Sequence, residues 1–205
     1  MAFGLKRIGS FLFAAPLALL PRVENLVSIA LGVSGVLLAA PKAWARVFLS
    51  QEEALKKAFP DANVIKRKTL FLDDRQVEKI EAAARARMTS RVITYYQAWE
   101  GGRITGTAYF DTQIVRTMPM TFMALVKPDG TLGLVEILSF YEPQDYLPRP
   151  AWLRVFAGKA LDDKLRLRWE IPSVTGSSLT CQAMTDGVRR LLAVHRVAVK
   201  KESAG

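Results

Sequence analysis

The sequence predicts an α+β fold, a single domain in which helices pack against a mostly antiparallel sheet. Short runs rich in β-branched and aromatic residues fill the middle of the chain, and turn residues separate them. The turn Pro128-Asp129-Gly130 joins two of these runs so tightly that an antiparallel hairpin is expected. Segments with the apolar spacing of amphipathic helices lie on both sides of this region.

The elements of the first half follow from caps and periodicity. Residues 50–53, Ser-Gln-Glu-Glu, form a capping box that begins a short helix, and Pro60 ends it after Phe59. A strand over 63–72 and a helix over 74–88 follow, because apolar residues recur in the latter every three or four positions. The four central strands are expected at residues 92–99, 104–111, 121–126 and 132–140.

Prolines interrupt the pattern after the strands, and a last helix ends it. Three prolines in residues 141–152 forbid a continuous helix or a central strand there, and a helical turn is expected near 152–156. In the last helix we expect His195 to lie on the apolar stripe and to have a packing or capping role. Arg189, on the opposite face, and Arg190 are expected as solvated helix charges rather than phosphate ligands.

The N-terminal residues 1–45 resemble a targeting segment. Basic residues precede an apolar run from Leu26 to Ala40, and Ala43-Trp44-Ala45 has the small-x-small form of a signal-peptidase site. We expect either a secretory signal peptide cleaved after Ala45 or an N-terminal membrane anchor. The protein would then be extracytoplasmic, either periplasmic or anchored and facing outside, with a domain over 46–198 and a disordered tail over 199–205.

Composition excludes several kinds of chemistry. The net charge of +10 suits an anionic partner or ligand, but the basic residues are scattered, so no nucleic-acid role is expected. One histidine and one cysteine, Cys181, provide neither a zinc site nor an intrachain disulfide. No P-loop, dinucleotide-binding or serine-hydrolase signature occurs. We therefore predict no catalytic residue and no metal, and leave open whether the protein is an enzyme in its own right.

Four hydroxyl side chains surround one glycine directly before the last helix: Thr175, Ser177, Ser178 and Thr180 around Gly176. Serine and threonine are preferred N-caps, so a plain helix cap is one interpretation. The N-terminus of a helix also binds phosphate, and glycine allows the backbone to approach a ligand closely. The residues alone leave both interpretations open.

The stretch Thr175-Gly176-Ser177-Ser178 resembles the S/T-G-A-T/S motif of the FMN-binding domain family. That family includes the C subunit of the sodium-translocating NADH:quinone reductase and the G subunit of Rnf complexes. The stretches "ITGTAYF", "MALVKPDGTLGLVEILSFYEP" and "WLRVFAGKALDDKL" also resemble it, so that the likeness covers roughly residues 90–195 in one order.

The resemblance implies FMN as cofactor, esterified through its phosphate to the last hydroxyl of the motif by a flavin transferase that uses FAD and magnesium. Here that hydroxyl belongs to Ser178. The other cofactor-binding residues that the resemblance implies, the last two of them beside the isoalloxazine, are Thr175, Gly176, Ser177, Leu179, Thr180, Glu142 and Pro143.

Two positions depart from the pattern of the family. The family usually has an acidic residue three positions before the first hydroxyl, where this chain has Pro172, and it usually has alanine where this chain has Ser177. Covalent and noncovalent FMN therefore both remain open. The resemblance predicts an exported electron-transfer flavoprotein that serves redox partner proteins, membrane-bound or periplasmic. The alternative is an exported binding or structural domain that has the same fold and no flavin.

Overall fold

The computed structural model describes residues 46–199, and a six-stranded sheet lies at its centre. The strand order is β1-β6-β5-β4-β3-β2, and every neighbouring pair is antiparallel. The strands are β1 (Arg46–Val47), β2 (Val64–Phe71), β3 (Val92–Glu100), β4 (Arg103–Ile114), β5 (Pro119–Val126) and β6 (Leu132–Phe140). The predicted fold class is confirmed, including the hairpin between β5 and β6.

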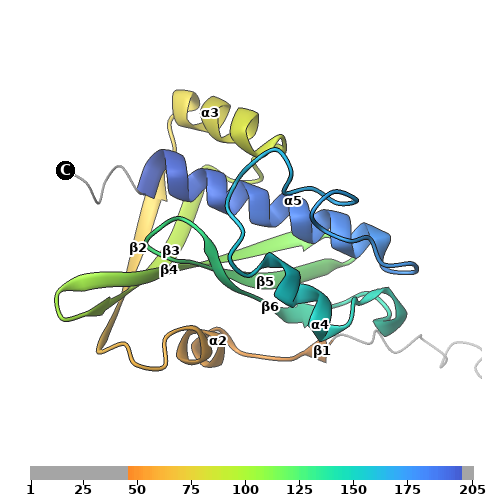
Figure 1. Cartoon of the computed structure of the whole chain (residues 1–205), viewed down its shortest axis with the longest axis horizontal. Coiled ribbons are helices and arrows are strands. Elements are labelled where there is room, and N and C mark those ends of the chain that lie inside the picture. The colour runs from red at the N-terminus through yellow and green to blue at the C-terminus, as the bar shows by residue number, and fades with distance from the viewer. Residues whose placement is uncertain (1–45, 200–205) are drawn as a thin grey trace, which may run out of the picture. The chain divides into compact units, whose positions relative to one another are not determined.

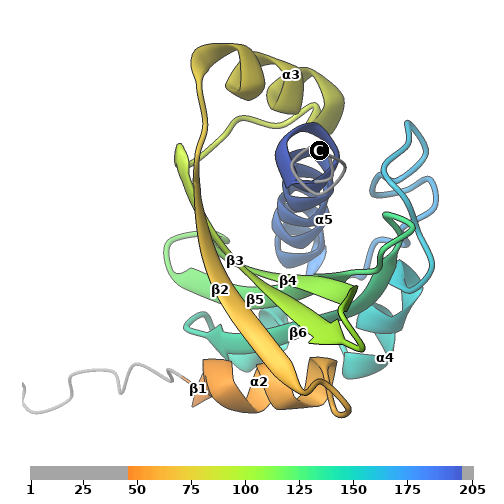
Figure 2. The same cartoon turned by 90° about the vertical axis from the view of Figure 1, so that its left-hand side faces the viewer.

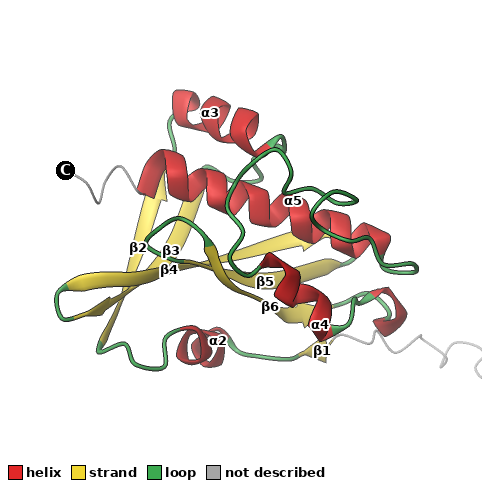
Figure 3. Ribbon diagram, in the orientation of Figure 1, coloured by secondary structure: helices red, strands yellow, loops and turns green. Residues whose placement is uncertain are grey.

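Helices cover both faces of this sheet (Figures 1 and 2). The helices are α2 (Gln51–Ala58), α3 (Asp74–Ala84), α4 (Pro150–Leu153) and α5 (Ser178–Val194). Short 3-10 turns form η1 (Gln144–Tyr146) and η2 (Arg154–Phe156), and a π-helical turn, η3 (His195–Val199), continues α5. Figure 3 shows that the chain between η2 and α5 is mostly loop.

Two apolar cores lie on opposite faces of the sheet. The larger core packs α5 against one face, with α3 packed on α5, and Phe122 and Phe140 of the sheet and Met184 of α5 are fully buried. The smaller core packs α2 against the other face through Leu55 and Phe59. In residues 46–199 the sheet therefore lies between α2 on one face and α5 on the other.

Helix α3 is shorter than the predicted range 74–88. It ends at Ala84 because Arg85 adopts a left-handed conformation with φ 52°. The backbone N–H of Met88 then donates to the Glu81 carboxylate at 2.8 Å, which holds the following loop against the helix. The apolar spacing of the helix continues through this loop in the sequence, so the sequence pattern did not indicate where the helix ends.

Arg189 and Arg190 are both buried, so the prediction that they are solvated charges is wrong. The guanidinium of Arg189 donates to the carbonyl oxygens of Ala84, Asp162 and Leu165, each at 2.7 Å, and to that of Ala83 at 3.3 Å. Burial lowers the pKa of Arg189. The side chain fixes α5 to the end of α3 and to the loop before α5.

His195 has the predicted packing role. It is buried, and its Nδ1 lies 2.9 Å from the hydroxyl of Tyr109, whose pKa burial raises. Cys181 is also buried. The helical segment extends through Val199, one residue into the range expected as tail.

The predicted signal or anchor segment, 1–45, and the rest of the tail, 200–205, lie outside the described residues. Within residues 46–199, no helix combines the length and apolar character that crossing a membrane requires. The same residues contain no group of histidine, cysteine or acidic side chains that could hold a metal ion.

Candidate functional site

The predicted site lies where the loop before α5 becomes helix. Gly176 has φ +84°, a conformation that residues with a side chain rarely adopt, and this turns the chain into the helix. Ser177 is the N-cap, and its carbonyl oxygen accepts the N–H of Cys181 at 2.9 Å. Within residues 46–199, no side chain caps this helix, and the N–H groups of residues 178–180 have no hydrogen-bond acceptor. The start of α5 therefore presents free donors at the positive end of the helix dipole.

The four hydroxyls of the loop divide into two pairs. Ser177 and Thr180 are buried, and they donate to the carbonyl oxygens of Asp145 at 3.5 Å and Tyr146 at 2.5 Å. Thr175 and Ser178 are exposed, and neither hydroxyl has a hydrogen-bond partner in the described part of the chain. The interpretation of these hydroxyls as a plain helix cap is therefore wrong.

Arg116 places a positive charge beside η1, the segment that Thr180 of α5 binds. Its guanidinium lies over the ring of Tyr146, 4.5 Å from the ring centroid. The carbonyl of Tyr146 is the group that Thr180 binds. Sequence reasoning missed Arg116, which belongs to no motif and lies in the loop between β4 and β5.

Glu142 and Pro143 directly precede η1, whose carbonyl groups accept from Ser177 and Thr180. Glu142 is buried, and its Oε1 accepts the backbone N–H groups of Thr117 at 2.7 Å and Met118 at 2.9 Å. These hydrogen bonds, that from Thr117 above all, lower the pKa of Glu142. Pro143 is exposed and leads into η1. The carboxylate thus holds the β4–β5 turn against the end of β6, and the position of both residues relative to a flavin stays a prediction.

Exposed apolar side chains lie on the segments that form the site. Leu179 follows Ser178 and is 55% exposed, Tyr141 precedes Glu142 and is 37% exposed, and Met118 is 43% exposed. These side chains are accessible for contact with a flat or apolar partner. The resemblance had indicated Leu179, and no sequence signal distinguished Met118.

The loop that carries the hydroxyls is fixed at its beginning as well. The indole Nε1 of Trp152 donates to the carbonyl oxygen of Pro172 at 2.7 Å. This contact ties the loop to α4 through the backbone of Pro172. The loop therefore has an anchor at each end, at Pro172 and at Ser177.

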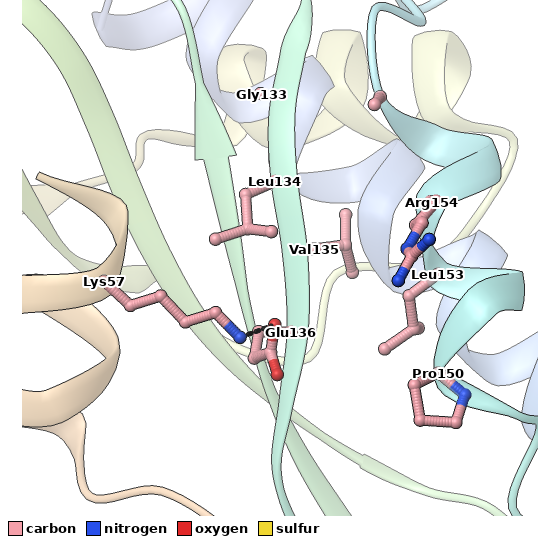
Figure 4. Close-up of a pocket in the computed structure, with 9 residues that line it drawn as sticks. Lys57, Gly133, Leu134, Val135, Glu136, Pro150, Leu153 and Arg154 are labelled. Atoms are coloured by element: carbon pink, nitrogen blue, oxygen red, sulfur yellow. Dashed lines mark hydrogen bonds and ion pairs between the residues drawn. The ribbon is translucent and has the colours of Figure 1, made fainter.

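A groove on the outer edge of the sheet is a different feature (Figure 4). It measures about 460 Å³ and lies between α2, β6 and α4. Its lining includes Lys57 and Glu136, which form an ion pair at 2.9 Å, but no hydroxyl or thiol that could act as a nucleophile. The start of α5 is therefore the better candidate.

No protein-family model matches the chain, and no curated protein matches it either. Among solved structures, the crystal structure of NqrC from Shewanella oneidensis is similar, with a TM-score of 0.48 and 16% sequence identity. The likeness covers 77% of this chain and 91% of that chain. A likeness of this size does not extend to function.

Proposed function

We propose that this protein binds FMN at the start of α5 and is an exported electron-transfer flavoprotein, with the FMN phosphate esterified to Ser178. The observation that carries the proposal is the uncapped N-terminus of α5. Its first residue, Ser178, has an exposed hydroxyl within a four-residue stretch that resembles the attachment motif.

The residues present fit a phosphate ester. The free N–H groups of residues 178–180 are donors for phosphate oxygens, and the positive end of the helix dipole favours the negative charge. Arg116 adds a cation on the adjoining segment. Ser177 stands where the family has alanine, and its buried position requires only a small side chain.

The attachment is a phosphoryl transfer. The hydroxyl oxygen of Ser178 forms a bond to the FMN phosphorus of FAD, and the bond from that phosphorus to the oxygen of the AMP phosphate breaks. AMP leaves with the electron pair of the broken bond, and the hydroxyl proton passes to the transferase. Because Ser178 is exposed, its hydroxyl is accessible to a second protein.

Bound FMN would supply one- and two-electron transfer, and the chain would supply its position. Anchors at Trp152 and Thr180 hold the loop and η1 in place. The exposed side chain of Leu179 directly follows the attachment point, and Tyr141 and Met118 are further exposed apolar side chains on the segments around Glu142. The segment 1–45 supports an extracytoplasmic location, and redox partner proteins there, periplasmic or membrane-bound, would exchange electrons with the flavin.

The test uses the full chain, coexpressed with a flavin transferase in a cell that exports it. The denatured protein is run on a gel, examined for flavin fluorescence, and digested for mass spectrometry. We expect fluorescence on the peptide that contains Ser178, and its loss in Ser178→Ala. Ser177→Ala is the matched control, one residue away and closer to the family motif, and it should keep the fluorescence, as should Ser178→Thr.

The other outcomes are distinct. A flavin on Thr175 would correct the attachment residue and keep the function. Yellow protein with a dark band would mean noncovalent FMN. Colourless protein with a dark band, from a cell in which the transferase modifies a known substrate, would overturn the proposal in favour of a flavin-free binding domain.

A further inference from the structure

A second cavity lies further along α5, away from the hydroxyl loop. It measures about 140 Å³ and is lined by α5, by β3 and β4, and by the loop that follows α3. Ser178 and Arg190 are 12 residues apart on α5, which corresponds to about 18 Å at about 1.5 Å per residue. The cavity is therefore separate from the proposed flavin site.

Arg190 brings unused hydrogen-bond donors to this cavity. Its side chain is only 8% exposed, and its one hydrogen bond within residues 46–199 runs from Nη2 to Oδ2 of Asp111 at 3.3 Å. The same oxygen accepts Nε2 of Gln113 at 2.6 Å. A guanidinium has five N–H donors, so most of those of Arg190 have no acceptor among the described residues.

The neighbouring arginine shows that this is not the general condition of a buried arginine in this protein. Arg189 makes four hydrogen bonds to carbonyl oxygens, whereas Arg190 makes one long one. The free nitrogens of Arg190 are not among the fully buried polar atoms that lack a partner, so they remain accessible. A ligand in the cavity can therefore accept hydrogen bonds from them.

The rest of the lining determines the kind of ligand. Apolar side chains make up part of the lining, namely Leu191 and Val194 of α5, Met88 and Ile93. Thr94 also lines the cavity. The volume is near that of an engineered cavity of about 150 Å³ that binds benzene, so the ligand has about six heavy atoms.

We propose that this cavity binds a short-chain monocarboxylate. The carboxylate would accept two parallel N–H bonds from Arg190, a geometry for which the planar guanidinium is suited. The alkyl chain would lie against Leu191 and Val194. Asp111 competes for the same guanidinium and repels the charge of the ligand. A variant without this charge should therefore bind the ligand more tightly.

The test titrates the full-length protein with sodium butyrate and follows the Nε–H signals of its arginines by ¹H–¹⁵N NMR. We expect a saturable shift of Arg190 and of the methyl groups of Leu191 and Val194. Arg189 is the internal control, because its Nε–H already donates to Ala84. Sodium chloride at equal ionic strength should not shift Arg190.

Two variants separate binding from folding. Asp111→Asn removes the competing charge and should tighten butyrate binding several-fold, an effect that misfolding cannot produce. Arg190→Gln should abolish the binding of butyrate. The proposal is overturned by a missing or unsaturable Arg190 shift, by equal affinity for n-butanol, or by an Asp111→Asn variant that binds butyrate no more tightly.

Discussion

The N-termini of α2 and α3 differ from that of α5, although all three contain side chains able to cap a helix. Ser50 with Glu53, and Asp73 with Gln76, form complete capping boxes in which side chain and backbone bind each other reciprocally. At α5, Ser177 and Thr180 turn inward to neighbouring carbonyls. At α5 these hydroxyls are held by tertiary carbonyls and do not accept from the helix, so α5 keeps its own donors free.

The largest effect is expected where a carboxylate satisfies backbone donors outside a helix. Glu142 serves the β4–β5 turn as Asp73 serves α3, but with an ionised, buried side chain. Glu142→Gln should lower the free energy of unfolding by about 2 kcal/mol, because charged hydrogen bonds are lost. Urea denaturation at neutral pH measures it, and an unchanged midpoint would contradict the role assigned to this carboxylate.

The same residue predicts a pH dependence. Because the folded-state pKa of Glu142 is lowered from an ordinary value of 4.5, its contribution is present above that pH and is lost as the pH falls through the folded-state pKa. Below pH 4.5 the wild-type protein should therefore lose stability more steeply than Glu142→Gln. Parallel curves for the two proteins over this range would speak against the assignment.

Thr180→Val tests the inward turn of the hydroxyls at α5. It removes the donor to the Tyr146 carbonyl, which is then left without that partner, and should cost about 1 to 2 kcal/mol. Thermal or urea unfolding measures the change. Thr180→Ser is the control, because it keeps the hydroxyl, and a loss in Thr180→Ser as large as in Thr180→Val would show that the methyl group is the important part.

Asp73→Ala and Ser178→Ala compare the two kinds of helix start directly. The first removes a true cap and should cost about 1 kcal/mol. The second removes an exposed hydroxyl without a partner in residues 46–199 and should change stability by less than about 0.5 kcal/mol. Equal losses in urea unfolding would mean that Ser178 caps α5 in solution, and would weaken the site proposed there.

Local signals in the sequence were sufficient for most of the fold. The capping box at Ser50 and the turn at Pro128-Asp129-Gly130 depend on residues close together in the chain, and both occur as predicted. Strand β1 was not predicted, because its two residues form a strand only through pairing with β6. The end of α3 was missed because the left-handed conformation of Arg85 has no signature in a residue of that type.

The candidate site was predictable in position but not in geometry. The sequence and the resemblance indicated the loop around Gly176, yet which hydroxyls face inward depends on carbonyls more than thirty residues away. Arg116 and the buried state of Arg189 depend on tertiary contacts too. A helical wheel places such an arginine on the polar face, because it does not include the carbonyl groups of α3 and of the loop before α5.

The sheet is assembled from strands that follow one another along the chain, whereas the helix that closes its larger core comes after all of them. Neighbouring strands from β2 to β6 are consecutive in sequence, so each hairpin can form as soon as it is synthesised. Residues 178–199 form the helical segment that packs onto the sheet and completes that core. A growing chain therefore carries an uncovered apolar sheet until the ribosome has delivered its last helix, and synthesis that stops before residue 178 leaves strands that attract chaperones or aggregate.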